Sequence, residues 1–342
     1  MPGMVAKVRR DMLEFLVTGG CGFIGSHLTD ALLRRGHRVR VLDNLSTGST
    51  ANLSSAATLI EGDIRDPAAV ADAMTGCDGC FHLAAVASVE RSNQEWLETH
   101  AVNLTGTIRI FEAARRAGRS GKPVPVVYAS SAAVYGDQGS GSINETAPQR
   151  PTSAYGADKL ACEHHARVAM LVHGVPTVGL RFFNVYGPRQ DPRSPYSGVI
   201  SIFCDRMAAG RPIPVVGDGN QTRDFIFVGD VVRALILARE RIPAVPRVLN
   251  VCTGRSTSVH DLAVTLARPL GCELRIERLA PRLGEIRHSL GNPEAARQAL
   301  AFAAEVSLAD GLDWTVRCLA PSPTAQPARY DVAENRALLE VR

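Results

Sequence analysis

The sequence predicts an α/β protein, with a doubly wound parallel sheet and a smaller, mixed α/β lobe. Three observations predict it. Short apolar runs alternate with helical patterns from residue 13 to residue 182, as in a sheet with crossover helices. A glycine-rich turn stands at the first strand-to-helix corner, over residues 19–25. Beyond residue 187 proline and glycine become frequent and the elements shorten, which indicates the smaller lobe.

The composition is that of an ordinary globular protein. The chain has 342 residues, of which 45% are hydrophobic and 21% charged. Its net charge of +4 is spread along the chain without a basic run, so nucleic acid is not implied. No apolar run approaches the ~20 residues that span a bilayer, and no signal peptide is visible. Eight scattered cysteines fit a reducing compartment. We therefore expect a cytoplasmic protein and, since nothing completes the pair Cys77 and Cys80, no metal site.

The first corner predicts a dinucleotide site. A strand over 13–18, a helix from the turn through residue 35 and a strand over 38–43 form a βαβ unit. Gly19, Gly22 and Gly25 let the backbone approach a pyrophosphate, to which the helix also presents its N-terminal N–H groups. Asp43 ends the second strand about twenty residues later, where a ribose partner is needed. A carboxylate there would repel a 2′-phosphate, which favours NAD over NADP.

The next elements continue the sheet. A third strand, over 58–64, ends in an acidic turn with Asp63. A fourth, over 79–85, exits into small residues that leave room for a ligand. A helix over 93–117 carries Asn103, and a fifth strand over 124–130 leads to Ser131. The run 175–182 is a further strand.

A helix that starts near Ser153 carries the candidate reactive group. Tyr155 and Lys159 are four residues apart and therefore share one helical face. A cation beside a phenol favours the phenolate, which can act as a general acid and base near neutral pH. Alone, this spacing is common by chance. It gains weight here because Ser131 should reach the same edge of the sheet.

The remaining residues divide between a lobe and a tail. We expect strands over 213–217, 225–228, 248–251 and 273–277, and helices over 229–239, 258–267 and 293–300. The predicted organisation is a mainly NAD-binding domain over 12–182, a mainly substrate-binding lobe over 183–320 with segments that return to the main sheet, and a loose tail over 321–342.

Taken together, the motifs resemble the extended short-chain dehydrogenase/reductase family, and within it the nucleotide-sugar 4-epimerases. The resemblance rests on seven pieces in family order: Thr18-Gly-Gly-Cys-Gly-Phe-Ile-Gly25, Asp43-Asn-Leu-Ser-Thr-Gly48, His82-Leu-Ala-Ala85, Ser130-Ser-Ala-Ala-Val-Tyr-Gly136, Tyr155-x3-Lys159, Arg181-Phe-Phe-Asn184-Val-Tyr-Gly187 and Arg223-Asp-Phe-Ile-Phe-Val228. It implies a Rossmann fold, a bound NAD, a UDP-sugar substrate, 4-epimerisation through a transient 4-keto sugar, and a homodimer formed through the helices around 93–117 and 155–172.

The resemblance also implies residue roles. Ser131, Tyr155 and Lys159 would be catalytic, with Lys159 on the nicotinamide ribose. The implied cofactor-binding residues are Gly19, Gly22, Phe23, Ile24, Gly25, Asp43, Asn44, Ser46, Asp63, Ile64, Leu83, Ala84, Ala85, Asn103, Tyr155 and Lys159. The implied substrate-binding residues are Ser131, Asn184, Val199, Arg223, Arg282 and Ser289.

Related chemistries remain as alternatives. The 4,6-dehydratases and sugar-nucleotide decarboxylases of the family place an acidic residue one or two positions after the equivalent of Ser131. Ala132 and Ala133 stand there in this chain, which disfavours both. UDP-glucose/UDP-galactose and UDP-glucuronate 4-epimerases stay open. A non-catalytic NAD-binding regulator is a different class, and the intact Ser131, Tyr155 and Lys159 argue against it.

Substrate choice depends on Ser289. In the resembling epimerases this position lies at the gate of the sugar pocket, where a tyrosine excludes N-acetylated sugars and a small residue admits them. The run Gly-Glu-Ile-Arg-His-Ser-Leu over 284–290 resembles the Gly-Asp-Val-Arg-His-Ser-Leu of epimerases that prefer N-acetylhexosamines, and 193–199 resembles their substrate loop. We therefore expect interconversion of UDP-N-acetylglucosamine and UDP-N-acetylgalactosamine.

Overall fold

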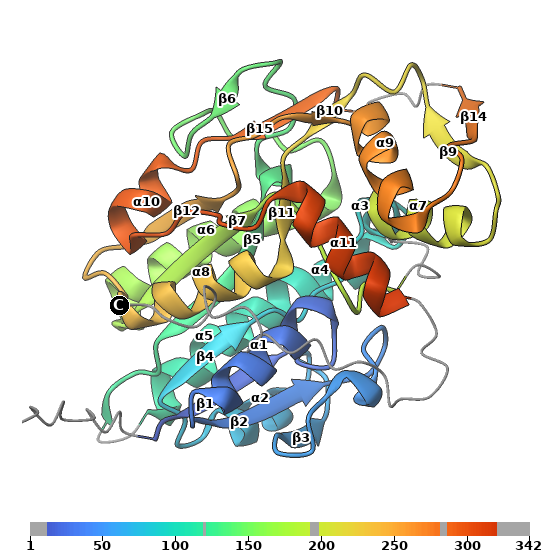
Figure 1. Cartoon of the computed structure of the whole chain (residues 1–342). Coiled ribbons are helices and arrows are strands. Elements are labelled where there is room, and N and C mark those ends of the chain that lie inside the picture. The colour runs from blue at the N-terminus through green and yellow to red at the C-terminus, as the bar shows by residue number, and fades with distance from the viewer. Residues whose placement is uncertain (1–11, 119–120, 192–197, 281–285, 320–342) are drawn as a thin grey trace, which may run out of the picture.

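A seven-stranded parallel sheet forms the centre of the protein (Figure 1). The structure is a computed structural model that describes residues 12–118, 121–191, 198–280 and 286–319. The strand order is β12-β7-β5-β4-β1-β2-β3, and every neighbouring pair is parallel. This confirms the predicted fold class. The strands are β1 (Glu14–Thr18), β2 (Arg38–Asp43), β3 (Thr58–Glu61), β4 (Gly79–His82), β5 (Val126–Ser131), β7 (Thr177–Phe182) and β12 (Arg247–Val251).

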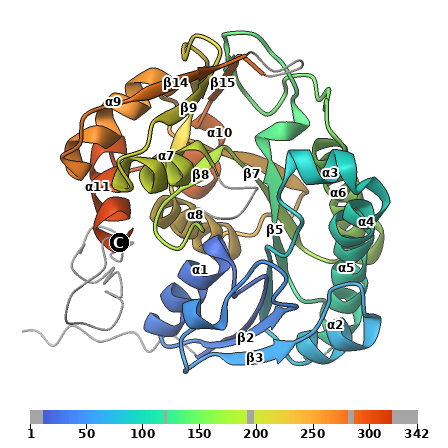
Figure 2. The ribbon, with the colours of Figure 1, turned by 90° about the vertical axis from the view of Figure 1, so that its right-hand side faces the viewer.

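Helices cover both faces of this sheet. Figure 2 shows α1 (Phe23–Arg34) and α8 (Val228–Glu240) on one face, and α2 (Pro67–Met74), α5 (Gly106–Ala117) and α6 (Ala154–His173) on the other. One apolar core lies under each helix layer. The chain runs outward from β1 to β2 and β3, then returns to β4 on the opposite side of β1. The carboxyl ends of β1 and β4 therefore border the crevice where such sheets bind ligands.

A second region of short elements lies beyond the carboxyl ends of the strands (Figure 1). Its strands pair as β8 (Asn184–Tyr186) with β11 (Phe225–Phe227), and as β14 (Ile276–Leu279) with β9 (Ile213–Val216). A further sheet has the order β13 (Thr257–Ser258), β10 (Thr222–Arg223), β15 (His288–Gly291) and β6 (Ser142–Ile143). The helices α7 (Val199–Ala208), α9 (Val259–Leu270) and α11 (Leu308–Leu319) pack around their own apolar core.

Several boundaries differ from the prediction. The strand predicted over 273–277 begins at Ile276, and the helix predicted over 258–267 continues to Leu270. The two-residue strands β6, β10 and β13 are too short to give a period-2 pattern, so they were not predicted. The helix predicted over 293–300 is α10 (Glu294–Leu300), which packs against β12.

The helix predicted over 93–117 is confirmed only in part. A break at Glu95 ends α3 (Val89–Gln94), and the chain is then helical from Trp96 to Ala117 through α4 (Trp96–His100), a π-helical turn (Ala101–Thr105) and α5. Glu95 leaves the helical region, with φ −114° and ψ 57°, and separates α3 from α4. The π turn carries Asn103, whose side chain is engaged elsewhere in the fold. Such single-turn bulges have no residue signature of their own, so the sequence does not reveal them.

A buried carboxylate holds the second region together. Asp224 follows β10, and its Oδ1 accepts hydrogen bonds from the backbone N–H and the hydroxyl of Thr253, at 2.8 and 2.7 Å. Its Oδ2 accepts from the N–H groups of Gly254 (2.9 Å) and Gly291 (3.4 Å). Burial raises the pKa of the Asp224 carboxyl, while these hydrogen bonds act in the opposite direction. One side chain thus joins three segments that are far apart in sequence.

Other sequence features can be placed briefly. All eight cysteines are free thiols. Within the described ranges, no helix combines the length and apolar character needed to cross a bilayer. The predicted tail, residues 321–342, lies outside the described residues.

We predict that Asp224→Asn destabilises the protein. The amide keeps one acceptor oxygen, but its NH₂ group must face an N–H group that now lacks an acceptor. We expect the free energy of unfolding to fall by about 1–3 kcal/mol, measured by urea denaturation. Asp218→Asn is the matched control, because Asp218 also accepts a backbone N–H, from Asn220, but is exposed. A loss of equal size in both variants would contradict the role given to Asp224.

Candidate active site

A cavity of about 530 Å³ opens along the carboxyl ends of the main sheet. It extends from the β2 and β3 side, at Asp43 and Asp63, to Asn184 and Val185 in β8. Its size lies within the range of small-molecule and cofactor sites. Most of the predicted cofactor-binding residues line this cavity, as do two of the predicted substrate-binding residues. The former are Gly19, Gly22, Phe23, Ile24, Gly25, Asp43, Asn44, Ser46, Asp63, Ile64, Leu83, Ala84, Ala85, Tyr155 and Lys159, and the latter are Ser131 and Asn184.

Two glycines make the turn after β1 possible. Gly19 has φ +70°, and a Cβ there would lie 2.8 Å from the backbone nitrogen of Ala84. A Cβ on Gly25 would lie 2.1 Å from the carbonyl oxygen of Gly19. The first turn of α1 therefore rests directly on the glycine turn, and both border the cavity. This leaves bare backbone and a helix N-terminus facing the space where a pyrophosphate would lie, so the residues fit a dinucleotide.

A chain of hydrogen bonds holds the floor of the cavity. His82 at the end of β4 contacts the hydroxyl of Thr18 through Nδ1 (2.8 Å) and that of Thr107 through Nε2 (2.9 Å). Thr107 donates its own proton to the carbonyl oxygen of Asn103, so its oxygen must accept from Nε2–H. Nδ1 then accepts from Thr18, whose oxygen also accepts the N–H groups of Leu83 and Ala84. Burial, with the Lys159 charge as the smaller cause, lowers the pKa of His82 to about 3, in agreement with a neutral ring.

Asp43 is oriented by the backbone. Its Oδ2 accepts from the N–H of Cys21 and its Oδ1 from the N–H of Leu45, both at 2.9 Å. Each carboxylate oxygen can accept a second hydrogen bond. The side chain is almost buried yet lines the cavity, so it is pre-positioned to accept from a hydroxyl group there.

The predicted adenine end is built on a second acidic turn. Asp63 accepts from Arg65 through both oxygens, at 2.8–3.0 Å, and from the side-chain amide of Asn44 at 2.9 Å. The hydrogen bonds from Arg65 are the main cause that lowers the pKa of Asp63 to about 2. Asn44 in turn accepts from the N–H of Ser46 (3.1 Å). These contacts tie the loop after β2 to the loop after β3.

The predicted reactive pair lies in the first turns of α6. The hydroxyl of Ser153 caps this helix by accepting the N–H of Gly156 at 3.1 Å. Lys159 Nζ donates to the carbonyl oxygen of Ala129 in β5 (2.9 Å) and lies 5.8 Å from the centre of the Tyr155 ring. The ammonium has two more N–H groups for a ligand. Tyr155 and Lys159 therefore face one space, as the i, i+4 spacing predicted.

Ser131 meets the same space because α6 approaches β5 closely. A Cβ on Gly156 would lie 2.6 Å from the carbonyl oxygen of Ala133, so the helix contacts the turn that follows β5. That 3₁₀ turn (Ala132–Val134) is capped by Ser131, whose Oγ accepts the N–H of Ala133 at 3.1 Å. The Ser131 hydroxyl keeps its proton free to donate into the cavity.

Asn103 does not line the cavity. Its Oδ1 accepts the N–H of Val86 (2.8 Å) and its Nδ2 donates to the carbonyl oxygen of Val86 (3.1 Å). The amide is fully buried and its hydrogen bonds with the loop after β4 engage both of its ends. Asn103 therefore supports the loop after β4, which lines the cavity, and its predicted contact with a cofactor stays a prediction.

The other predicted substrate residues lie beside the cavity or outside the described residues. Arg223 and Ser289 are register partners in β10 and β15, and Val199 begins α7. None of the three lines the cavity. Arg223 donates to the carbonyl oxygens of Thr222 (2.9 Å) and Arg287 (3.3 Å). Arg282 and most of the segment 193–199 are outside the described residues.

Sequence reasoning missed several residues of the cavity wall. Phe182 ends β7 and Phe183 follows it, so their place at the carboxyl end of a strand could have indicated them. Arg91 in α3 and Glu98 in α4 give no such signal, because their place depends on how the broken helix packs on α6. The remaining unpredicted lining residues are Leu42, Thr47, Gly48, Gly62, Arg65, Val86, Ala87, Val102, Ala129, Ser130, Val185, Gln190 and Gly198.

Comparison with known proteins agrees with this geometry. The model of the NAD dependent epimerase/dehydratase family matches residues 15–252. A UDP-glucose 4-epimerase of Mycolicibacterium smegmatis is 39% identical and covers 89% of this chain and 97% of its own. Among solved structures, the UDP-N-acetylglucosamine 4-epimerase of Methanobrevibacter ruminantium is 34% identical with a TM-score of 0.84, covering 90% of this chain and 98% of its own. The Thermus thermophilus UDP-glucose 4-epimerase complexed with NAD is 35% identical with a TM-score of 0.81, covering 89% and 98%.

We predict that Gly25→Ala abolishes NAD retention. The new methyl group would overlap the carbonyl oxygen of Gly19, so the turn must open and the helix N-terminus must move. The measurement is the NAD(H) released by denaturing the purified variant. Gly141→Ala is the control, because a Cβ there meets nothing within 4 Å. Wild-type NAD content in Gly25→Ala would refute the role given to this turn.

Proposed function

The chain belongs to the NAD dependent epimerase/dehydratase family, and we propose that it interconverts UDP-N-acetylglucosamine and UDP-N-acetylgalactosamine by epimerisation at C4. The general activity, NAD-dependent epimerisation of a UDP-sugar, follows from the family and from relatives that cover nearly the whole chain. The observation that carries the chemistry is the meeting of Ser131, Tyr155 and Lys159 in one cavity with the glycine turn. The N-acetylated substrate is the finer part of the proposal.

The residues divide the work as follows. When bound, NAD would supply the redox chemistry at C4. Gly19, Gly22 and Gly25 would hold its pyrophosphate and Asp43 its adenosine ribose. Tyr155, as the phenolate, would accept the proton of the sugar 4-hydroxyl and return it to the same oxygen after the sugar has turned its other face to the cofactor.

Two neighbours assist Tyr155. Lys159 places its positive charge 5.8 Å from the centre of the Tyr155 ring, and its free N–H groups would hold the nicotinamide ribose. Ser131 donates to or accepts from the 4-oxygen and so fixes its direction. The 4-keto sugar must turn over within the site between the two half-reactions, which requires that its diphosphate stay bound while its ring is released.

The distribution of acids supports an epimerase over a dehydratase or decarboxylase. In the described part of the cavity wall the acidic residues are Asp43, Asp63 and Glu98. Asp43 and Asp63 lie at the β2 and β3 end, and Glu98 pairs with Arg65. Ala132 and Ala133 follow Ser131, so the two positions that carry an acid in the dehydratases and decarboxylases carry none here.

The placement of β15 supports Ser289 as part of the sugar pocket. Ser289 lies opposite Arg223 in the register of β10 and β15. Asp224 follows Arg223 in the chain, and its backbone carbonyl oxygen accepts a hydrogen bond from the N–H of Asn184 at 3.0 Å. Asn184 lines the end of the cavity. We propose that Asn184, Arg223 and Arg282 bind the UDP moiety, that Val199 contacts the substrate, and that the small Ser289 leaves room for an acetamido group.

A second candidate is the UDP-glucose/UDP-galactose pair. It is favoured by the name of the 39% identical Mycolicibacterium relative. The two candidates differ in one substituent at C2. Turnover of the four UDP-sugars, followed by NMR, decides between them, and activity on the non-acetylated pair alone would overturn the finer proposal.

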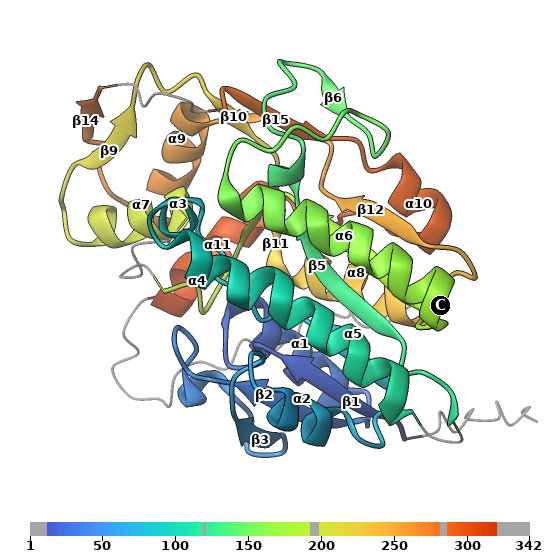
Figure 3. The same cartoon turned by 180° about the vertical axis from the view of Figure 1, so that it is seen from behind.

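We also propose that the protein is a homodimer. Figure 3 shows α4, α5 and α6 together on one outer side of the molecule. Large apolar side chains of α4 and α6 are exposed, namely Trp96, Leu97, Val168, Leu171 and Val172. His100 and Asp158 link the two helices through a 2.9 Å contact. A second copy would cover this face, and sedimentation would report the dimer.

We predict that Tyr155→Phe lowers kcat by at least ~10²-fold, since it removes the group that transfers the proton. Bound NAD and UDP-sugar affinity should persist, because the ring remains. Tyr186→Phe is the control: its hydroxyl is buried beside Ser307 and does not line the cavity. Near-normal turnover by Tyr155→Phe would remove Tyr155 from the mechanism.

We predict that Ser289→Tyr abolishes turnover of the acetylated pair and spares the non-acetylated pair, because overpacking a rigid wall costs ~1–3 kcal/mol or more. The assay compares kcat/KM for the four UDP-sugars. Ser256→Tyr, an exposed change just before β13 in the same small sheet, serves as the control. Equal losses on both pairs would show that Ser289 does not select the sugar.

A further inference from the structure

A buried ion pair joins the helix that carries Tyr155 to the main sheet. Arg181 in β7 donates from Nε to Oε1 of Glu163 in α6 (2.8 Å) and from Nη2 to Oε2 (2.6 Å). The two side chains are only 5% and 6% exposed. Such two-point contacts fix the relative orientation of both groups. Neither residue lines the cofactor cavity, so the proposed mechanism gives them no role.

The pair also binds both ends of the segment that contains Ser131. Ser130 donates its hydroxyl proton to Glu163 Oε1 at 2.5 Å. After the 3₁₀ turn, the Tyr135 hydroxyl accepts from Arg181 at 2.7 Å and donates to Asn250 Oδ1 at 2.7 Å. Ser131 lies between these two anchored residues.

Glu163 and Lys159, both in α6, form hydrogen bonds with neighbouring residues at the end of β5. Lys159 donates to the carbonyl oxygen of Ala129, and Glu163, one turn further along α6, accepts from Ser130. Tyr155 lies one turn before Lys159 on the same helix. The two contacts therefore set the distance between Tyr155, on α6, and Ser131, the next residue of β5.

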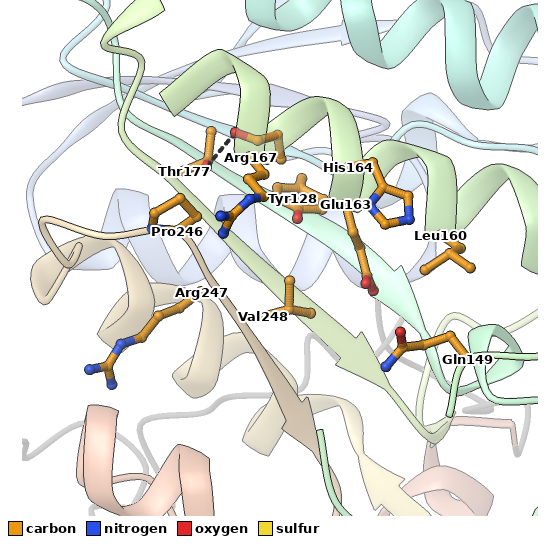
Figure 4. A pocket seen from close by; sticks show the side chains of 11 residues that line it. Tyr128, Gln149, Leu160, Glu163, His164, Arg167, Thr177, Pro246, Arg247 and Val248 are labelled. Atoms are coloured by element: carbon orange, nitrogen blue, oxygen red, sulfur yellow. Dashed lines mark hydrogen bonds between the residues drawn. The ribbon is translucent and has the colours of Figure 1, made fainter. Parts of the chain in front are cut away.

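Packing alone does not hold the Glu163 carboxylate. Figure 4 shows Glu163 at the edge of a second cavity, of about 170 Å³, on the side of α6 that faces Tyr128 and Val248. The side chains around Glu163 thus have space to move on that side. Buried ion pairs also add little net stability relative to apolar residues of the same volume. The Glu163–Arg181 pair therefore contributes more to the orientation of α6 on the sheet than to the stability of the fold.

We propose that Glu163, oriented by Arg181, is a positioning residue that acts through Ser130 to hold Ser131 and Tyr155 in register for proton transfer at C4. The proposal rests on the proposed function and adds a group outside the cavity to it. A displacement of about 1 Å at a reacting group can cost ~10²-fold in rate, so a contact this close to Ser131 should affect kcat.

The test compares two variants that each remove one hydroxyl tie between α6 and the sheet. Ser130→Ala removes the bond to Glu163 and leaves the ion pair intact. Thr177→Val removes the bond from the Thr177 hydroxyl to the carbonyl oxygen of Ala166 (3.1 Å), which lies further along the same helix (Figure 4). Both variants are studied as the NAD-loaded, full-length protein, with the UDP-sugar that the wild type turns over.

We expect Ser130→Ala to lower kcat tenfold or more with little change in KM or NAD content, and Thr177→Val to keep at least half of the wild-type kcat. Glu163→Gln, which also removes the charge facing Arg181, should lose at least as much as Ser130→Ala wherever it folds. Wild-type kcat in Ser130→Ala, or equal losses in Ser130→Ala and Thr177→Val, would overturn the proposal.

Amide hydrogen exchange separates this proposal from the proposed function. Ser130→Ala should accelerate exchange at residues 131–135 and in the first turn of α6, and Thr177→Val should not. If the wild type turns over no UDP-sugar, the proposed function is wrong. Amide exchange still tests whether Glu163 and Ser130 hold the segment that contains Ser131. Unchanged exchange at 131–135 in Ser130→Ala would refute the positioning itself.

Discussion

Contacts between bare backbone segments determine the shape of the cavity. At Gly25 the helix α1 rests on the glycine turn, at Gly19 that turn meets the loop after β4, and at Gly156 the helix α6 meets the turn after β5. Each approach leaves less than 3 Å for an added Cβ, a separation that side chains do not tolerate. These three glycines let the cavity walls approach each other from both sides of the sheet and so set the width of the cavity. The helices and loops that meet at the glycines then place the side chains that line it.

Buried polar side chains fix those relative positions of strands and helices that the backbone contacts leave undetermined. Asp224 gathers the ends of β10, β12 and β15, while Glu163 with Arg181 fixes α6 on β5 and β7. Thr18, His82 and Thr107 connect β1 and β4 to α5. Buried groups of this kind are costly unless every partner is present, so each network admits few alternative arrangements. This specificity, more than net stability, explains how short strands with little apolar pattern can form an ordered second region.

The sequence predicted those features that depend on local spacing. The glycine turn, Asp43 at a strand end and the Tyr155–Lys159 pair are set within one or two elements, and the structure brings them to one cavity. It could not predict Asn103, because a π turn and a backbone partner 17 residues away decide where that amide points. Arg91 and Glu98 were missed for the same reason: their direction follows from the packing of α3 and α4 against α6. The register of β10 with β15 joins residues 66 apart, a pairing that no periodicity encodes.

The neutral state of His82 has a consequence for acid tolerance. A second ring proton would make Nδ1 a donor toward Thr18, whose oxygen already accepts two N–H groups and whose own proton would lose its acceptor. The folded pKa is about 3 and the unfolded value about 6.5, so the unfolded chain binds the proton first. Stability is therefore lost progressively as the pH falls from about 6.5 toward 3. Acidification would thus weaken the joint between β1 and β4, whose carboxyl ends border the cavity, so cofactor retention should fall over the same pH range in which this stability is lost.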